Sequence, residues 1–288
     1  MSTIAESELI LNEDGSIYHL KLKPGDLAEK IITVGDPHRV DMVIQHFDKI
    51  LLERRSREFR TVTGEIGNTI VSVISTGIGT DNIDIVFNEI DALFNIDFDT
   101  RKIKDRLRSL KFMRLGTSGS IQSAVPIDSL VISETAVGIE GLLHMYQYLE
   151  SQQEERTSKA ISLIMPAGLR PITTSGSSSL IERFDKEFKR VNTVTATGFY
   201  APQGRQLRLA PAVPDLIKAL SDLSVGDLQL HNLEMETAGI YGLSSLLGHE
   251  AISISAILAN RVTQEFSKQP QEIVDKMIKV ALAQWVTC

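Results

Sequence analysis

The residues of this sequence best suited to chemistry are arginines that stand beside glycines where predicted strands end. The clearest case is Lys111 to Gln122, an apolar run that contains Arg114 and passes into Gly116, Thr117 and Gly119. An arginine in a buried strand needs an anionic partner or a polar pocket, because its charge is costly to desolvate. Glycines let a backbone approach a ligand, and loop amides and hydroxyls can converge on an anion. The segment predicts a buried strand that delivers a loop for phosphate or another oxyanion. A simple turn beside an internally paired arginine is the alternative.

A second arginine follows the same pattern nearer the N-terminus. The run Ile31 to Val34 predicts a strand, Gly35 follows it, and Asp36 and Pro37 suit the cap and the first position of a helix. Free amides and the positive end of the helix dipole then face any ligand at this point. Arg39, in the first turn, adds a formal positive charge. The segment predicts a second anion contact, with an ordinary strand-to-helix turn as the alternative.

Two later segments carry side chains that can bind a ligand. One has the groups that recognise a flat ring, and the other has two acidic residues. Phe199 to Arg205 combines an aromatic face, the amide of Gln203 and a guanidinium, which together can recognise a heterocycle. A turn made by the proline and glycine of this segment is the alternative. Glu234 and Glu236 stand at the start of a small, apolar helix. Acidic residues in a first turn commonly complement the helix dipole, and we expect one of these two to do only that.

The elements that must position these residues alternate between strands and helices. Strands are expected at residues 31–34, 49–53, 59–66, 69–75, 129–135, 191–197 and 251–259, and helices from residues 37 and 81 and at 178–189 and 238–247. Residues 97–110 predict a surface insertion with a short helix, and residues 150–160 predict a polar segment that connects or caps neighbouring elements. Strands that alternate with helices and end in glycine or hydroxyl loops indicate an α/β fold with ligands at the strand ends.

Composition limits the class of protein. The chain has 288 residues, of which 42% are hydrophobic and 23% charged, as in ordinary globular proteins. Its net charge of -7 argues against a nucleic-acid partner, because phosphate backbones are bound by basic surfaces. The single cysteine, Cys288, excludes an internal disulfide and a cysteine-based zinc site, and it favours a reducing compartment.

Membrane segments and common hydrolytic motifs are not recognisable. Met1 to Ser16 carries acids where a signal peptide would be basic, and no apolar run reaches membrane-spanning length. We therefore expect a flexible N-terminal tail over residues 1–16, a cytoplasmic location and no membrane partner. Serine hydrolase, zincin and P-loop patterns are absent, so hydrolase and NTPase functions lack support.

Six short motifs occur along the chain in an order that resembles the nucleoside phosphorylase family, in its uridine phosphorylase branch. They are Gly35-Asp-Pro-x-Arg39, Ser75-Thr-Gly-Ile-Gly79, Arg114-Leu-Gly-Thr-Ser-Gly119, Phe199 to Arg205, Glu234-Met-Glu236 and Asn260-Arg261. The resemblance runs from about Tyr18 to the C-terminus, and it is specific because all six motifs agree in order. The chain departs from the family pattern at Thr80-Asp81, at Ser118 and in the longer segment 97–110.

The resemblance implies a fold, a reaction and an assembly. The fold is a single α/β domain over residues 17–288, with a central mixed, barrel-like sheet surrounded by helices. The reaction is phosphorolysis of uridine, and of other pyrimidine nucleosides, to the free base and ribose 1-phosphate. The enzyme is then a pentosyltransferase that needs inorganic phosphate as co-substrate and no cofactor. The assembly is a homo-oligomer, at least a dimer, whose subunits share their active sites.

The same resemblance assigns roles residue by residue. Phosphate is bound by Gly35, Arg39, Arg114 and Thr117, with Arg57 from a neighbouring subunit. Ribose is held by Met235 and Glu236, with His19 of the neighbour at the 5′-hydroxyl. The pyrimidine is bound by Gln203 and Arg205, with Phe199 stacking nearby. The expected catalytic groups are Arg114, Gln203, Arg205 and Glu236. A monovalent cation, K+, is expected at the dimer interface near Glu58 and Ser75.

Three other functions remain open at this point. A purine nucleoside phosphorylase or a purine nucleosidase of the same fold would usually carry an aspartate just after the strand 251–259, and none lies between Ala251 and Gln264. A nucleosidase would also not need so many arginines around phosphate. A non-catalytic nucleoside-binding protein would have lost site residues, whereas groups for anion, sugar and base are all present.

Overall fold

The strand that carries Arg114 lies at the centre of the sheet. β7 (Lys111–Ser120) pairs in parallel with β1 (Lys30–Val34) along one edge and with β14 (Glu250–Asn260) along the other. Its apolar residues Phe112, Met113 and Leu115 are fully buried, as the sequence predicts. The computed structural model describes residues 3–184 and 187–288.

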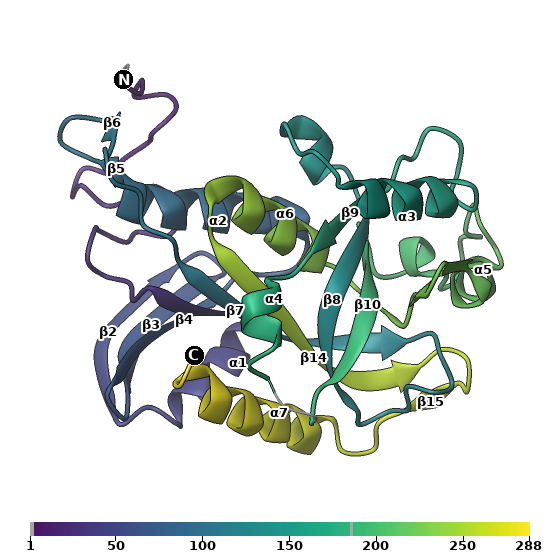
Figure 1. The fold of residues 1–288 in the computed structure, drawn as a ribbon. Helices are drawn as coiled ribbons and strands as arrows, with labels where there is room; N and C mark the ends of the chain where they lie inside the picture. Colours follow the sequence, from purple (N-terminus) through teal and green to yellow (C-terminus); the bar gives the residue numbers. More distant parts are fainter. Residues whose placement is uncertain (1–2, 185–186) are drawn as a thin grey trace.

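Five strands close into a ring. β7 pairs with β14, β14 with β8 (Leu130–Ile139), β8 with β10 (Lys189–Ala196), β10 with β13 (Asn232–Glu234), and β13 pairs back with β7. The ring contains both parallel and antiparallel pairs, so the predicted mixed, barrel-like sheet is confirmed. β4 (Thr69–Ser75), β3 (Phe59–Ile66) and β2 (Lys49–Ser56) continue the sheet outward from β1 as the curved wing on the left of Figure 1. β9 (Ile172–Ser175) pairs with β8, and β15 (Glu265–Phe266) with β14.

Helices cover the sheet from several sides (Figure 1). The described residues form α1 (Pro37–Ile44), α2 (Thr80–Asn95), α3 (Gln152–Ser162), α4 (Ser178–Ile181), α5 (Leu216–Asp222), α6 (Thr237–Leu247) and α7 (Pro270–Trp285). α2 and α6 lie together on one face, and α7 crosses the opposite one. The helix expected from residue 81 is present as α2, and its Ile83, Val86, Phe87 and Ile90, which lie at helical spacing, are all fully buried.

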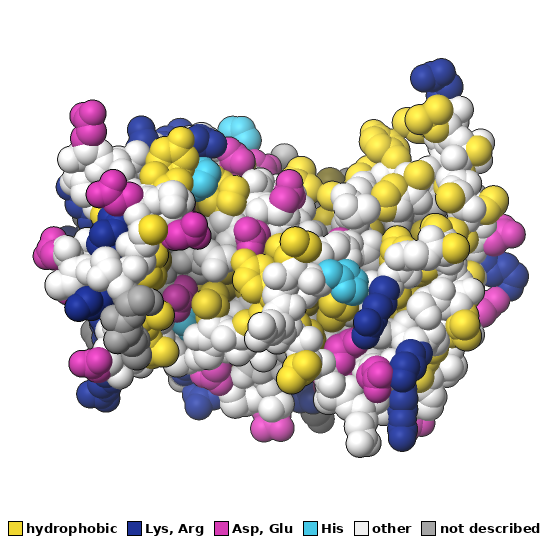
Figure 2. Space-filling model, turned by 90° about the horizontal axis from the view of Figure 1, so that it is seen from above, with side chains coloured by type: hydrophobic (Ala, Val, Ile, Leu, Met, Phe, Trp, Pro, Cys, Tyr) yellow, Lys and Arg dark blue, Asp and Glu magenta, His cyan; other side chains and the backbone are white. Residues whose placement is uncertain are grey.

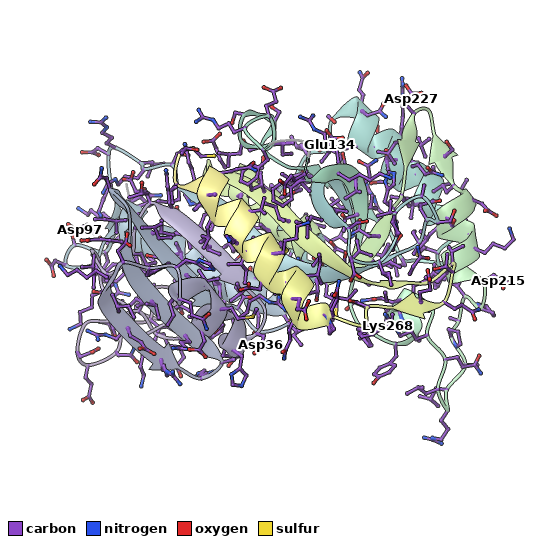
Figure 3. The ribbon with its side chains drawn as sticks, turned by 90° about the horizontal axis from the view of Figure 1, so that it is seen from below. Asp36, Asp97, Glu134, Asp215, Asp227 and Lys268 are labelled. Atoms are coloured by element: carbon purple, nitrogen blue, oxygen red, sulfur yellow. The ribbon has the colours of Figure 1, made fainter. Side chains whose placement is uncertain are left out.

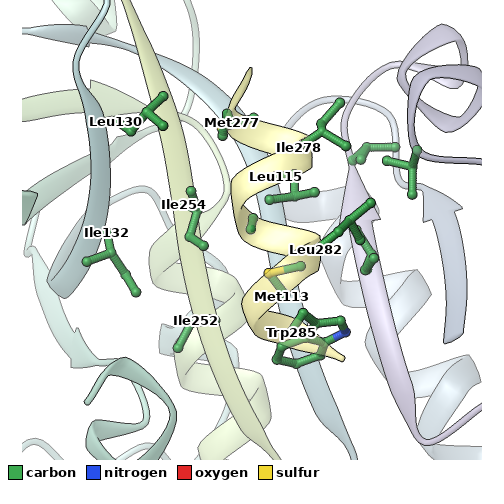
Figure 4. Close-up of a cluster of buried hydrophobic side chains, with 14 of the residues drawn as sticks. Met113, Leu115, Leu130, Ile132, Ile252, Ile254, Met277, Ile278, Leu282 and Trp285 are labelled. Atoms are coloured by element: carbon green, nitrogen blue, oxygen red, sulfur yellow. The ribbon is translucent and has the colours of Figure 1, made fainter. Parts of the chain in front are cut away.

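α7 packs its apolar face on the two central strands. Figure 4 shows Met277, Leu282 and Trp285 beside Met113 of β7 and Ile254 of β14, and all five side chains are buried in one cluster. Burying one large apolar side chain contributes about 1.5–3 kcal/mol, so this contact holds the central strands firmly. Arg114 stands between Met113 and Leu115 in β7, so its side chain leaves the opposite face of the strand and reaches the candidate site.

The surface of the molecule mixes charges of both signs. On the upper face, Lys and Arg side chains are scattered among acidic ones (Figure 2), in keeping with the net charge of -7. Seen from below, Asp97 and Asp215 mark the two ends of the molecule, with α7 between them (Figure 3). Within residues 3–184 and 187–288, no helix has the length and apolar character required to cross a bilayer.

Two predicted segments around the central strand were wrong. Residues 116–120, expected as a loop, continue β7 because their backbone pairs with β14 and with β13. Residues 97–110 contain no helix; they hold a small hairpin of β5 (Ile96–Asp97) and β6 (Lys102–Ile103). The Asp97 carboxylate accepts hydrogen bonds from the N–H and hydroxyl of Thr100, a local turn that competes with a helix.

Two predictions further along the chain also fail. Residues 150–160, expected as a polar connecting or capping segment, contain most of α3, which begins with a capping box between Ser151 and Glu154. The helix expected over 178–189 ends at Ile181, although residues 185 and 186 of that prediction lie outside the described residues. Phe184 and Phe188 pack against each other in the core, with ring centroids 5.6 Å apart, and β10 already begins at Lys189.

The N-terminal segment makes several contacts with the body of the domain. Leu9 is buried, and Arg101 donates side-chain hydrogen bonds to the carbonyl groups of Ile4 and Ala5 at 3.0 and 3.1 Å. Residues 1 and 2 of the expected tail lie outside the described residues. The division into a tail over 1–16 and a domain over 17–288 stays a prediction.

Candidate active site

One cavity of about 740 Å³ lies where several parallel strands end. β4, β1, β7 and β14 lie side by side in that order, each parallel to the next, so their carboxyl ends meet at one edge of the sheet. The cavity gathers most of the predicted site residues: Gly35, Arg39, Glu58, Arg114, Thr117, Phe199, Gln203, Arg205, Met235 and Glu236. Their spread from residue 35 to residue 236 means that only the fold brings them together.

Arg114 lies in the wall of this cavity and is held by two carboxylates. Its Nη2 is 2.5 Å from Oε2 of Glu236 and 3.3 Å from Oε2 of Glu234, and its Nη1 donates to Oγ of Ser255 at 3.3 Å. Burial alone would lower the pKa of Arg114, but the two carboxylates outweigh it and raise the pKa. Burial raises the pKa of Glu234, an effect that the charge of Arg114 opposes. The guanidinium is therefore charged and fixed in direction.

Gly116 makes room for this guanidinium. A Cβ at residue 116 would lie 1.9 Å from Nη1 of Arg114, far inside contact distance. The sequence predicts that Gly116 lets the backbone approach a ligand. The structure gives that space to the side chain of Arg114 instead.

Glu236 is held from two directions at the start of α6. Its Oε1 accepts a hydrogen bond from the N–H of Gly79 at 2.8 Å, and its Oε2 contacts Arg114. Gly79 has φ +97 and directly precedes α2, so a conformation that favours glycine aims its amide at the carboxylate. Glu236 is 5% exposed and lines the cavity, where its remaining lone pairs can accept from hydroxyl groups.

Arg39 adds a second positive charge on this side of the cavity. It stands in the first turn of α1, which Asp36 caps by accepting from the N–H of His38 at 2.9 Å (Asp36 is labelled in Figure 3). Its Nη1 donates to the carbonyl of Leu115 at 3.3 Å. Burial, and then the nearby charge of Arg114, lowers the pKa of Arg39. An anion bound between the two guanidinium groups would relieve this repulsion, with Gly35 and Thr117 lining the same cavity.

The opposite part of the lining comes from the segment 199–205. The Nη1 of Arg205 donates to Oε1 of Gln203 and to the carbonyl of Phe199, both at 2.7 Å, and its guanidinium lies 3.8 Å from the centroid of the Phe199 ring. Burial and the charge of Arg261 lower the pKa of Arg205 to about 10. A nearby anion would therefore stabilise the charged form of the Arg205 guanidinium.

Arg261 holds this segment and was not among the predicted site residues. Its Nη1 donates to the carbonyl of Gln203 at 2.9 Å and its Nη2 to the carbonyl of Gly204 at 3.3 Å. The sequence contained the signal, an arginine two residues after the strand 251–259. It could not show that this arginine serves a loop more than fifty residues earlier in the chain.

His19, Arg57 and Ser75 do not line the cavity. His19 contacts Glu89, with 2.6 Å between Nδ1 and Oε1, and its ring packs edge-on against Tyr18 at 4.8 Å. The guanidinium of Arg57 lies 5.6 Å from the centroid of the same Tyr18 ring. The two residues expected to serve a neighbouring subunit thus both lie next to the ring of one tyrosine.

Ser75 is held by two backbone groups. It is fully buried; its Oγ donates to the carbonyl of Glu58 at 2.6 Å and accepts from the N–H of Arg60 at 2.8 Å. Glu58 is exposed and lines the cavity, so its carboxylate is one available oxygen ligand. This pair does not make a set of ligands for K+ within one chain.

Comparison with known proteins identifies the family. The model of the phosphorylase superfamily matches residues 29–284. The uridine phosphorylase of Thermococcus kodakarensis is 31% identical over 277 residues, which cover 95% of this chain and 89% of that protein. A solved nucleoside phosphorylase of Trypanosoma brucei that shows uridine phosphorylase activity has a TM-score of 0.89 at 29% identity and covers 97% of this chain and 100% of that chain. A DeoD-type purine nucleoside phosphorylase of Caldanaerobacter subterraneus is 26% identical over 273 residues, which cover 92% of this chain and 97% of that protein. The chain therefore belongs to the phosphorylase superfamily.

Proposed function

We propose that this protein is a uridine phosphorylase, a pentosyltransferase that converts uridine and inorganic phosphate to uracil and ribose 1-phosphate. The observation that carries this proposal is that one cavity holds Arg39 and Arg114, the carboxylate of Glu236, and the pair Gln203 and Arg205. These groups match an anion, a sugar and the polar edge of a ring. The relatives named as uridine phosphorylases, which match along nearly the whole chain, support the same reaction.

In the proposed reaction, a phosphate oxygen forms a bond to the anomeric carbon while the glycosidic C–N bond breaks. The electron pair of that bond leaves with the base, and no covalent enzyme intermediate is needed. The protein must align the reactants and stabilise the charge on the departing ring. Arg39, Arg114, Gly35 and Thr117 would hold phosphate, and Met235 and Glu236 the ribose hydroxyls.

Base selection is assigned to Gln203 and Arg205. Uracil presents a carbonyl, an N–H and a second carbonyl along one edge, and a glutamine amide supplies one donor and one acceptor. Arg205 adds donors only, and its charge favours the anion that forms as the bond breaks. Cytosine fits poorly, because its amino group would meet a donor and its N3 lacks the hydrogen.

A substrate panel tests this proposal. We expect kcat/KM to rank uridine far above cytidine and inosine, with deoxyuridine and thymidine as weaker substrates. Sites built on such hydrogen bonds can reject a mismatched analogue by roughly 10⁴-fold. Gln203→Ala should narrow the ratio of uridine to cytidine. A preference for inosine, or an unchanged ratio in the variant, would contradict the assignment.

The subunits of this enzyme are proposed to complete each other's sites. Arg57 would reach the phosphate of a neighbouring subunit, and His19 its 5′-hydroxyl. Their position next to Tyr18, outside the lining of their own cavity, supports a contribution to another copy. A homo-oligomer, at least a dimer, follows from this assignment.

Two further proposals concern ions and location. Inorganic phosphate is the only co-substrate that the mechanism requires. K+ stays a proposed ion at the subunit interface near Glu58 and Ser75; because Ser75 already bonds to two backbone groups, the ion would need further oxygen ligands from a neighbouring subunit. We assign the enzyme to the cytoplasm, on the basis of a chain with one cysteine.

A further inference from the structure

Glu234 is a buried carboxylate in the wall of the cavity that the proposed reaction does not use. It is the last residue of β13 and is 4% exposed. Its Oε1 accepts from the hydroxyl of Thr195 at 2.6 Å, and its Oε2 from the N–H of Glu236 at 2.9 Å. The N–H of Thr237 lies 3.1 and 3.0 Å from the two oxygens. Nη2 of Arg114 is 3.3 Å from Oε2.

These contacts use up the accepting capacity of the carboxylate. An ionised carboxylate has about four lone-pair sites, and the donors of Thr195, Glu236, Thr237 and Arg114 converge on them. Glu234 has no acceptor left for a ribose hydroxyl or a phosphate group. Any influence on the reaction must pass through the residues that it holds.

The residues that Glu234 holds belong to three different elements. Thr195 is in β10 and also accepts from the N–H of Ala238 at 2.9 Å; Arg114 is in β7; Glu236 and Thr237 begin α6. We propose that Glu234 is a positioning residue, which fixes the guanidinium of Arg114 and the turn through Met235 and Glu236 relative to each other. The inference rests on the proposed function, because it concerns the phosphate and ribose contacts of that same site.

The geometry gives this role a clear physical basis. Glu236 also contacts Arg114, so without Glu234 the guanidinium would keep one carboxylate and its charge would remain balanced. The turn, however, would lose the acceptor for two consecutive backbone N–H groups. Reacting groups that move by about 1 Å can cost on the order of 100-fold in rate. Direction, not charge, is the property that Glu234 supplies.

Three substitutions of Glu234 separate direction from charge. Glu234→Gln keeps the shape and an acceptor for the turn but removes the charge, and Thr195 can accept from the new amide. Glu234→Asp keeps the charge but withdraws it by one methylene, and Glu234→Ala removes both. We expect Glu234→Gln to stay within about threefold of the wild-type kcat/KM, and the other two to lose roughly 10- to 100-fold.

The ratio of kcat/KM for uridine to kcat/KM for 2′-deoxyuridine tests the positioning role, because a general loss of stability would leave this ratio unchanged. Glu234→Ala should displace Arg114 and so raise the KM for phosphate. It should also displace Glu236 and so lower the ratio of kcat/KM for uridine to that for 2′-deoxyuridine. Thr174→Val is the matched control, because Thr174 is a buried hydroxyl that contacts the carbonyl of Ala238 in α6 at 3.3 Å but neither Arg114 nor Glu236. Thr174→Val should lower the Tm and leave the KM for phosphate and the ratio of uridine to 2′-deoxyuridine unchanged. Thr195→Val should act like Glu234→Ala in a weaker form, even if Glu234→Ala fails to fold.

The outcomes divide cleanly. A folded Glu234→Ala with the wild-type phosphate KM and ribose preference would overturn the proposal. Equal losses in Glu234→Gln and Glu234→Ala would also overturn it, because charge would then be the essential property. If the wild type does not cleave uridine, the proposed function fails. The positioning role is then tested separately by the rise in Tm that phosphate produces, which Glu234→Ala should reduce and Glu234→Gln should keep.

Discussion

Arg114 reaches the cavity because the second residue after it is a glycine. Gly116→Ala would place a Cβ 1.9 Å from Nη1 of Arg114, so the guanidinium must move away from Glu236. We expect the KM for phosphate to rise by about tenfold or more, in line with a lost charge-assisted contact of roughly 1.5–3 kcal/mol. Steady-state kinetics at varied phosphate concentration measures this.

Gly119→Ala is a suitable comparison in the same strand. A Cβ there would meet no atom closer than 3.9 Å, and that atom belongs to Arg261. Its effect on the KM for phosphate should be clearly smaller. Equal effects of the two substitutions would mean that the loss comes from the strand and not from Arg114.

At the residue scale, the sequence predicted which groups meet but not how they are held. The cost of desolvating Arg114 correctly predicted an anionic partner or a polar pocket, and the structure provides both. The partners Glu234 and Glu236 lie 120 or more residues away, and their distance from Arg114 depends on strand pairing that local pattern does not contain. The roles of these residues toward substrate stay predictions.

Helix α3 shows what local sequence signals can add at the scale of elements. Ser151 accepts from the N–H of Glu154, whose carboxylate in turn accepts from the N–H of Ser151. Ser151→Ala should lower the free energy of unfolding by about 1 kcal/mol. For a domain of this size, that corresponds to a fall in Tm of about 2–4 °C.

Activity should distinguish this change from a change in the site. α3 does not line the cavity, so Ser151→Ala should keep the wild-type kcat and KM values for uridine and phosphate. Calorimetry and kinetics on the same preparation make the comparison. A loss of kcat without a fall in Tm would contradict a purely local effect of the cap.

Elements with a strong apolar signal were predictable, and those without one were not. α2 buries residues at helical spacing, whereas α6, β3 and β4 bury nearly continuous runs of residues. α3 buries Thr157, Ser158 and Ile161, so its face carries little hydrophobic signal and only the capping box marked it. The segment 97–110 had the spacing of a helix, yet its Ile103 and Leu107 are 44% and 59% exposed because no neighbouring element covers them.

At the scale of the whole molecule, the ring of five strands could be named only through the family resemblance. It joins β7, β8, β10, β13 and β14, and the pairings of β7 with β13 and with β14 cross more than a hundred residues of chain. Hydrophobic period predicts strands but not their partners. β7, β13 and β14 of this ring contribute residues to the cavity, so the site itself is a product of this long-range order.

The proposed sharing of sites between subunits predicts complementation. Arg114→Ala and Arg57→Ala should each lose most activity. In a mixed dimer, one site would combine an intact Arg114 with an intact Arg57 from its neighbour. Refolding the two variants together in equal amounts should then restore about a quarter of the wild-type activity.

The control for this experiment is Arg54→Ala, because Arg54 is a nearby exposed arginine whose side chain bonds to the carbonyl of Glu53. Arg54→Ala should be active without mixing. A native mass equal to the 31.8 kDa of one chain in an active sample would contradict sharing. So would a mixture no more active than its separate components.

The measurement that tests the central claim most directly is the release of uracil from uridine with and without inorganic phosphate. The account predicts that uracil appears only when phosphate is present and that ribose 1-phosphate forms in equal amount, because Arg39 and Arg114 serve to bind the attacking anion. Release of uracil together with free ribose in the absence of phosphate would contradict it.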